Sequence, residues 1–321
     1  MTETIHCFKE GTMRKNENRL GKIKMGKDVA ALHIIAYVFC TVMALLCLIP
    51  FVMVVSGSFS SEASISANGF SLFPYEISLE AYKTVFKEPL VIARAYCVTI
   101  GLTVVGTALG LVFSVMTAYV LCRQDFAWRN AFSFFFYFTT LFSGGLVPTY
   151  ILYMNTLNLG NTYTAMLLPL LFSVYNLLIM KSYITSIPES LVDAAKIDGC
   201  SEVRILFKII MPLVKPALAT VGLLIALSYW NSWYHAMLFI TDEKMFPLQY
   251  FLYDTVNNIE AYKRLIASGA SVSINISSAL SMPSQTLKMA LTVVVTGPIV
   301  LAYPFVQKYF VQGITIGAVK G

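Results

Sequence analysis

Six long apolar runs constrain the fold of this sequence more than any other feature. They cover residues 30–57, 95–121, 130–153, 163–180, 216–240 and 286–307, and none carries Asp, Glu, Lys or Arg in its central part. A helix of about 20 apolar residues spans the hydrocarbon core of a bilayer. Because lipid offers no partners to backbone N–H and C=O groups, such segments form helices. The sequence therefore predicts an all-α, polytopic membrane protein with six transmembrane helices.

The composition agrees with this prediction. Only 12% of the 321 residues are charged and 57% are hydrophobic, whereas soluble domains are about 25% charged. The length alone would allow two soluble domains. The uncharged runs exclude that arrangement.

The basic residues predict the orientation in the membrane. Sixteen of the 23 Lys and Arg residues lie before the first run, between runs two and three, between runs four and five, or after the sixth. The positive-inside rule places these segments, and both termini, in the cytoplasm. We therefore expect a basic cytoplasmic tail at 1–28, a transmembrane domain at 29–310 and a cytoplasmic tail at 311–321. The net charge of +6 is a signal of topology, and no nucleic-acid partner is expected because no basic, folded surface is evident.

The runs lack charged groups in their central parts that could couple transport to a proton gradient or a membrane potential. Proton relays and voltage sensors need charged groups inside the membrane, although sodium coupling through backbone carbonyls needs none. Gly21–Lys27 fits the first seven positions of a phosphate loop, but Asp28 stands where a Ser or Thr must bind magnesium. No H-E-x-x-H or other enzymatic pattern is present. We expect no catalysis and no bound nucleotide, cofactor or metal.

A charged segment at 186–212 separates the fourth and fifth runs. Ser186-Ile-Pro-Glu189 fits a capping box that would start a helix, and Gly199 can take the left-handed conformation that ends it. A second helix is predicted at 203–210, with one apolar face. The residues of that face are Val203, Leu206, Phe207 and Ile210. Taken by itself, the segment could also be an amphipathic connector on the membrane surface.

The spacing within this segment is specific. Asp193-Ala194-Ala195, Gly199, Ile209 and Pro212 fall at the positions of the pattern E-A-A, three residues, G, nine residues, I-x-L-P. The segment resembles the signature loop of binding-protein-dependent ABC importers. Asp193 replaces the usual Glu and Met211 the usual Leu, and both changes are conservative.

Further motifs extend the resemblance over residues 70–321. Phe142–Tyr150, Trp230-Asn-Ser-Trp233 and the stretch from Tyr303 to Gly321 are similar to carbohydrate ABC transporter permeases, the MalG-like proteins and their LplC/YtcP-like branch. Before the second run this chain has Arg94-Ala95 where many relatives have Asn-Ser. Any role of that asparagine does not carry over.

The resemblance implies a type I ABC importer permease fold and alternating access. The partners it implies are a second, homologous permease, two ABC ATPase subunits that hydrolyse ATP, an extracellular substrate-binding lipoprotein and an oligosaccharide, all at a bacterial cell membrane. The implied contacts with the ATPase in the coupling loop are Glu189, Asp193, Ala194, Ala195, Asp198, Gly199, Ile209 and Pro212. The implied C-terminal contacts are Gly313, Gly317, Lys320 and Gly321, although a frayed end is the default for a terminus.

A possible substrate path combines aromatic and amide side chains within the runs, where rings can stack on sugars and amides can bind hydroxyls. Its residues are Ser143, Tyr175, Asn176, Tyr229, Trp230, Asn231 and Trp233. Alternatively, the rings belong to an interfacial belt and Asn231 bonds a neighbouring helix. Gly106 and Gly110 form a G-x-x-x-G pattern that predicts helix packing. Two other functions remain open: an ABC permease for a non-sugar solute and an ion-coupled secondary carrier.

Overall fold

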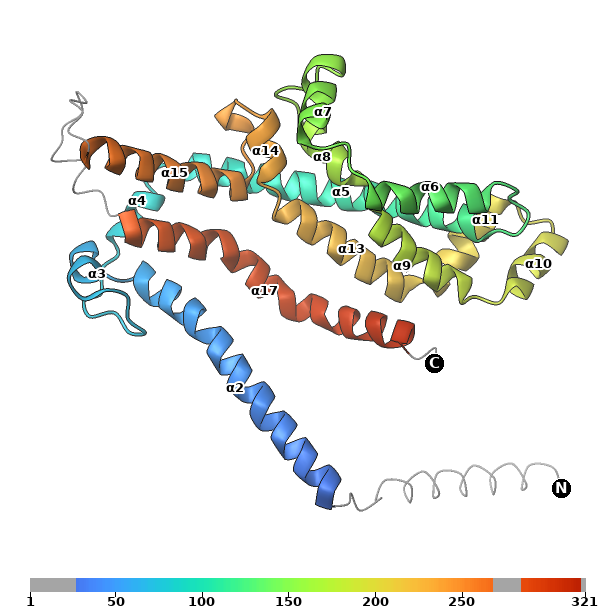
Figure 1. Cartoon of the computed structure of the whole chain (residues 1–321), viewed down its shortest axis with the longest axis horizontal. Helices are drawn as coiled ribbons and strands as arrows, with labels where there is room; N and C mark the ends of the chain where they lie inside the picture. Colours follow the sequence, from blue (N-terminus) through green and yellow to red (C-terminus); the bar gives the residue numbers. More distant parts are fainter. Residues whose placement is uncertain (1–26, 268–283, 319–321) are drawn as a thin grey trace.

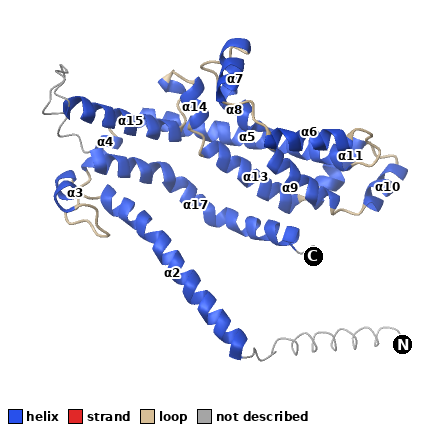
Figure 2. Cartoon of the chain, in the orientation of Figure 1, coloured by secondary structure: helices blue, strands red, loops and turns tan. Residues whose placement is uncertain are grey.

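The computed structural model describes residues 27–267 and 284–318. Within these ranges the chain is helical, and its one extended pairing is an isolated antiparallel bridge between Ser60 and Ile77 (Figure 2). The prediction of an all-α protein is confirmed for the described residues.

Two helices are long and apolar enough to cross a bilayer unbroken. They are α2 (Lys27–Ser58) and α5 (Pro89–Cys122), which contain the first two apolar runs. The short helices α3 (Glu62–Asn68) and α4 (Glu80–Val85) connect them. In Figure 1, α2 diverges from the other helices, and none of its most apolar window is buried within the chain.

A single helix was predicted for each of the third and fourth apolar runs, but both runs are broken. The third forms α6 (Arg129–Leu141), followed by α7 (Leu146–Ile151) and the π-helical turn η1 (Leu152–Thr156), with a bend of 111°. The break falls at Ser143-Gly-Gly145, where Gly145 has a φ of 87°. Such a φ is unfavourable for residues with a Cβ and ends regular helix.

The fourth run divides into α8 (Tyr163–Leu171) and α9 (Val174–Thr185), which meet at 46°. Phe172 and Ser173 between them are extended. By length and apolarity, the described residues contain two spanning helices, or five if each bent pair forms one span.

The remaining helices form the C-terminal part of the chain. The fifth run forms α13 (Lys215–Trp230) and the short α14 (Tyr234–Phe239). The 3₁₀ turn η3 (Glu243–Met245) and α15 (Leu248–Ala267) follow. The sixth run lies in α17 (Ser284–Ala318), which continues past residue 310. The predicted start of a separate tail at 311 therefore falls within a helix.

The core is centred on the contact between α5 and α13. Gly106 of α5 lies against the ring of Tyr229, and a Cβ built on Gly106 would come within 2.3 Å of that ring. The Tyr229 hydroxyl donates to the carbonyl of Leu167 in α8, at 2.7 Å. Gly110 lies one turn further along, close to the Leu171 carbonyl and Ile225. The predicted packing role of this glycine pair is confirmed.

Candidate coupling segment

The segment between α9 and α13 folds as a helical corner. Helix α10 (Glu189–Ile197) is followed by the cap residue Asp198 and by Gly199, whose φ is 75°. The Cys200 N–H donates to the Ala195 carbonyl at 2.9 Å, and the Gly199 N–H donates to the Lys196 carbonyl at 3.0 Å. These bonds satisfy carbonyls at the helix end, so the prediction for Gly199 is confirmed.

The start of α10 differs from the predicted capping box. The N-cap residue is Pro188, without a side-chain cap, and the Ser186 hydroxyl donates to the Tyr183 carbonyl at 2.6 Å. Ser186 instead caps the end of α9. The Glu189 carboxylate accepts from Gln124 Nε2 at 2.6 Å, and therefore ties the start of α10 to the turn after α5.

The second helix of the corner is also less regular than expected. It consists of α11 (Glu202–Ile205), the π-helical turn η2 (Leu206–Ile210) and α12 (Met211–Leu213), which meet α13 at 86°. A π-turn adds a residue and rotates the faces that follow. Ile205, Leu206 and Ile210 are buried, whereas Val203, before this turn, and Phe207, within it, are exposed. The four residues predicted to share an apolar face are therefore divided between buried and exposed positions.

Helix α10 presents two different faces. Val192 and Ala195 are buried in the core cluster. Asp193, Ala194 and Asp198 are exposed, and Ile197 is 86% exposed. Of the predicted contacts, Ala195 is therefore a packing residue within the chain. The acidic and small residues beside it form an accessible surface.

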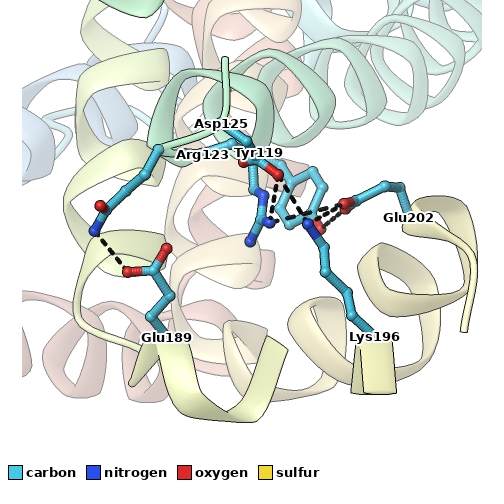
Figure 3. A network of polar contacts seen from close by, with 7 residues as sticks. Tyr119, Arg123, Asp125, Glu189, Lys196 and Glu202 are labelled. Carbon is cyan, nitrogen blue, oxygen red and sulfur yellow. Dashed lines mark hydrogen bonds and ion pairs between the residues drawn. The ribbon is translucent and has the colours of Figure 1, made fainter. Parts of the chain in front are cut away.

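A network of charges holds α10 and α11 against the end of α5 (Figure 3). Lys196 Nζ lies 2.8 Å from Asp125 Oδ2 and 2.9 Å from Glu202 Oε1. Arg123 Nη2 lies 3.1 Å from Asp125 Oδ2 and 3.7 Å from Glu202 Oε1. Tyr119, on the last turns of α5, donates its hydroxyl to Glu202 Oε2. We call these five residues the clasp.

Electrostatics favour the charged forms of the clasp. Hydrogen bonds from Lys196 and Arg123 hold the pKa of Asp125 well below its usual range. Hydrogen bonds to Asp125 and Glu202 raise the pKa of Lys196. The Arg123 side chain is 12% exposed, whereas Asp125 and Glu202 are about half exposed. Exposed pairs contribute little individually, but here two cations share the same two carboxylates.

No contact with the corner was predicted from the sequence for Tyr119, Arg123 or Asp125. Asp125 and Lys196 are 71 residues apart in the chain, and no local pattern pairs them. The available signal was the cluster Arg123-Gln-Asp125 directly after an uncharged run. That cluster marks a membrane boundary without indicating its partners.

The residues of the possible substrate path come from several different elements. Ser143 lies at the break between α6 and α7 and Tyr175 near the start of α9, and both are exposed. Asn176 is buried, and Tyr229 is engaged with α5 and α8. To contact a sugar, Tyr229 would have to give up these packing interactions.

Three other residues of this path lie at or just after the C-terminal end of α13. Trp230 ends the helix, with an indole N–H that is buried and has no hydrogen-bond partner among the described residues. Asn231 Nδ2 donates to the Leu227 carbonyl at 2.9 Å, within its own helix end. The predicted alternative, a bond from Asn231 to a neighbouring helix, is not seen. Trp233 stacks on Tyr253 of α15 with ring centres 4.5 Å apart.

The predicted C-terminal contacts are only partly described. Gly313 and Gly317 lie within α17. Lys320 and Gly321 lie outside the described residues, as does the basic tail up to residue 26. Their role in binding an ATPase stays a prediction.

Known proteins share both the sequence and the fold. Residues 110–316 match the family model "Binding-protein-dependent transport system inner membrane component". The chain is 38% identical to the polygalacturonan/rhamnogalacturonan transport system permease protein YtcP of Bacillus subtilis, over 89% of this chain and 96% of that protein. It is 29% identical to the trehalose/maltose permease MalG of Thermococcus litoralis, over 90% and 97% of the two chains.

A solved structure supports the same assignment. It belongs to a bacterial ABC transporter involved in the import of the acidic polysaccharide alginate, and one of its chains superposes with a TM-score of 0.76. The two chains are 31% identical, and the match covers 90% of this chain and 100% of that one. The charged corner at 186–212 lies within the region that matches the family model. The chain therefore belongs to the inner-membrane permease components of binding-protein-dependent ABC transport systems.

Proposed function

We propose that this chain is the membrane-spanning subunit of an ATP-driven importer that moves oligosaccharides into the cytoplasm by alternating access. The observation that carries the proposal is the helical corner at 186–212, because it presents an exposed face on α10 while its other face is anchored in the core. A permease of this family has no ATPase of its own and must receive movement from another subunit. The corner is the described segment best shaped to receive it.

The partners follow from the family. Two ATPase subunits bind the exposed residues of α10 on two permeases, and a second, related permease completes the path. An extracellular binding protein delivers the sugar. The complex lies in a bacterial cell membrane, and this chain contributes six spans with both termini in the cytoplasm. The third and fourth spans are the broken helix pairs described above, and the fifth contains α13 and α14.

The names of the relatives support an oligosaccharide as the cargo. YtcP is named for polygalacturonan and rhamnogalacturonan, MalG for trehalose and maltose, and the solved transporter for alginate. All of these are carbohydrates. The exposed Trp233–Tyr253 stack beside Trp230 offers aromatic faces of the kind that bind sugar rings.

The test is uptake by the intact complex, purified through a tag on this chain and reconstituted in proteoliposomes. Oligogalacturonides and maltose serve as probes, with ATP enclosed beside the ATPase subunits. We expect accumulation of one sugar class that requires both ATP and the binding protein. Uptake that survives ATP depletion and collapses with an ionophore would instead identify an ion-coupled carrier. ATP-dependent uptake of amino acids or ions in place of sugars would identify the non-sugar alternative.

A further inference from the structure

We infer that the clasp passes the movement of α10 directly to helix α5, so that Lys196 is a positioning residue for transport. This inference rests on the proposed function, since it assumes that an ATPase moves α10. It assigns a second route for that movement, separate from the chain connection through α11 and α12 to α13.

The geometry of Lys196 supports a bracing role. Its ammonium group reaches Glu202 on the far side of Gly199 and Asp125 in the turn after α5. Lys196 therefore fixes the angle at the Gly199 corner and attaches that corner to another part of the chain. Gln124 makes a second attachment to Glu189, at the start of α10. The two ends of α10 are thus both tied to the three-residue stretch Arg123–Asp125.

Helix α5 is suited to carry movement across the membrane. Its 34 residues correspond to about 50 Å at 1.5 Å per residue. At the opposite end from the clasp, Thr99 Oγ1 accepts from the Leu248 N–H of α15 at 2.8 Å. Tyr96 donates to the Val294 carbonyl of α17 at 2.5 Å. One continuous helix thus connects the clasp to α15 and α17.

The direct route through the chain is bent and has a pocket beside it. The corner meets α13 at 86° through the π-turn η2. An apolar pocket of about 210 Å³ lies between α5, this turn and α13, lined in part by Leu111, Val115, Leu206, Met211 and Leu218. Incomplete packing forfeits contacts, so part of the contact between η2 and α5 is lost at this pocket, although Leu206 and Ile210 are themselves buried. The clasp also joins the corner to the end of α5, through direct contacts between charged groups at Arg123, Lys196 and Glu202.

The first test compares Lys196→Met with Lys196→Arg in the reconstituted complex. Lys208→Met is the matched control, because Lys208 is exposed in the same segment and forms no ion pair with the described residues. We expect Lys196→Met to retain ATP hydrolysis but to lose at least about fivefold in sugar imported per ATP, the lower end of typical coupling energies. Lys196→Arg should restore the ratio. An unchanged ratio in Lys196→Met would overturn the inference.

The second test does not depend on transport. Spin labels at Trp128 and Ser190, both exposed, report the distance between the turn after α5 and α10 in the full complex. We expect the same distance in nucleotide-free and ATP-trapped states, and a broader distribution in Lys196→Met. A wild-type distance that changes with nucleotide would show that the clasp opens, and would overturn the inference. If no sugar is imported at all, the proposed function fails, while this measurement still reports on the clasp.

Discussion

At the scale of single residues, Gly106 shows how sequence spacing can predict a contact. Its partner Tyr229 lies so close that an added Cβ would meet the ring at 2.3 Å. We predict that Gly106→Leu destabilises the protein by about 1–3 kcal/mol, as overpacked cores do. Gly101→Leu is the control, since nothing lies within 4 Å of a Cβ at Gly101 of the same helix. Thermal unfolding in detergent measures both, and equal loss would contradict the packing role.

The pH dependence of Asp125 is a second prediction at this scale. Lys196 and Arg123 lower its pKa below the ordinary value of 3.8, so its ion pairs stabilise the fold fully above that value. The contribution is lost as the pH falls below 3.8 toward the lowered pKa. The difference in melting temperature between wild type and Asp125→Asn should therefore stay constant from pH 5 to 8 and shrink below about pH 4. A difference that grows on acidification would contradict this assignment.

At the scale of elements, two substitutions of Gly199 distinguish the effect of backbone strain from the effect of an added charge. Its φ of 75° disfavours most side chains, but nothing lies within 4 Å of a Cβ built there. Asp and Asn both tolerate this conformation. We predict that Gly199→Asp inserts in the membrane normally yet abolishes transport, because it adds a charge at the surface where we propose that the ATPase docks. Gly199→Asn has the same shape without the charge and should transport better. Equal uptake by wild type and Gly199→Asp would contradict the docking role.

The helix breaks explain why the fold was only partly predictable. The apolar runs correspond to the described apolar helices, from α2 to α17, because hydropathy depends on composition. The breaks at Ser143–Gly145 and at Phe172–Ser173 depend on how neighbouring helices cover the freed backbone groups, which a single sequence does not show. At the corner, too, some features could be predicted from the sequence and others could not. The spacing of the motif predicted the helix end at Gly199. The π-turn at 206–210 and the bond from Gln124 to Glu189 arise from tertiary contacts.

At the scale of the whole molecule, the distribution of charge predicts the topology. The basic segments include the one that holds α10, so this helix should face the cytoplasm, and the loop between α3 and α4 should face outward. Phe73 in that loop is 79% exposed and Ile197 of α10 is 86% exposed, which makes them a matched pair for labelling. Each is replaced by cysteine in a cysteine-free chain within intact cells.

A membrane-impermeant maleimide should label Phe73→Cys in intact cells, and Ile197→Cys only after the membrane is opened. This outcome requires an odd number of membrane crossings between residues 73 and 197. Crossings at α5, at the α6–α7 pair and at the α8–α9 pair supply three, provided that each bent pair spans the membrane once. Labelling of both cysteines from outside would mean that one bent pair re-enters on the same side. In that case α10 would lie outside the cell, where no ATPase could reach it.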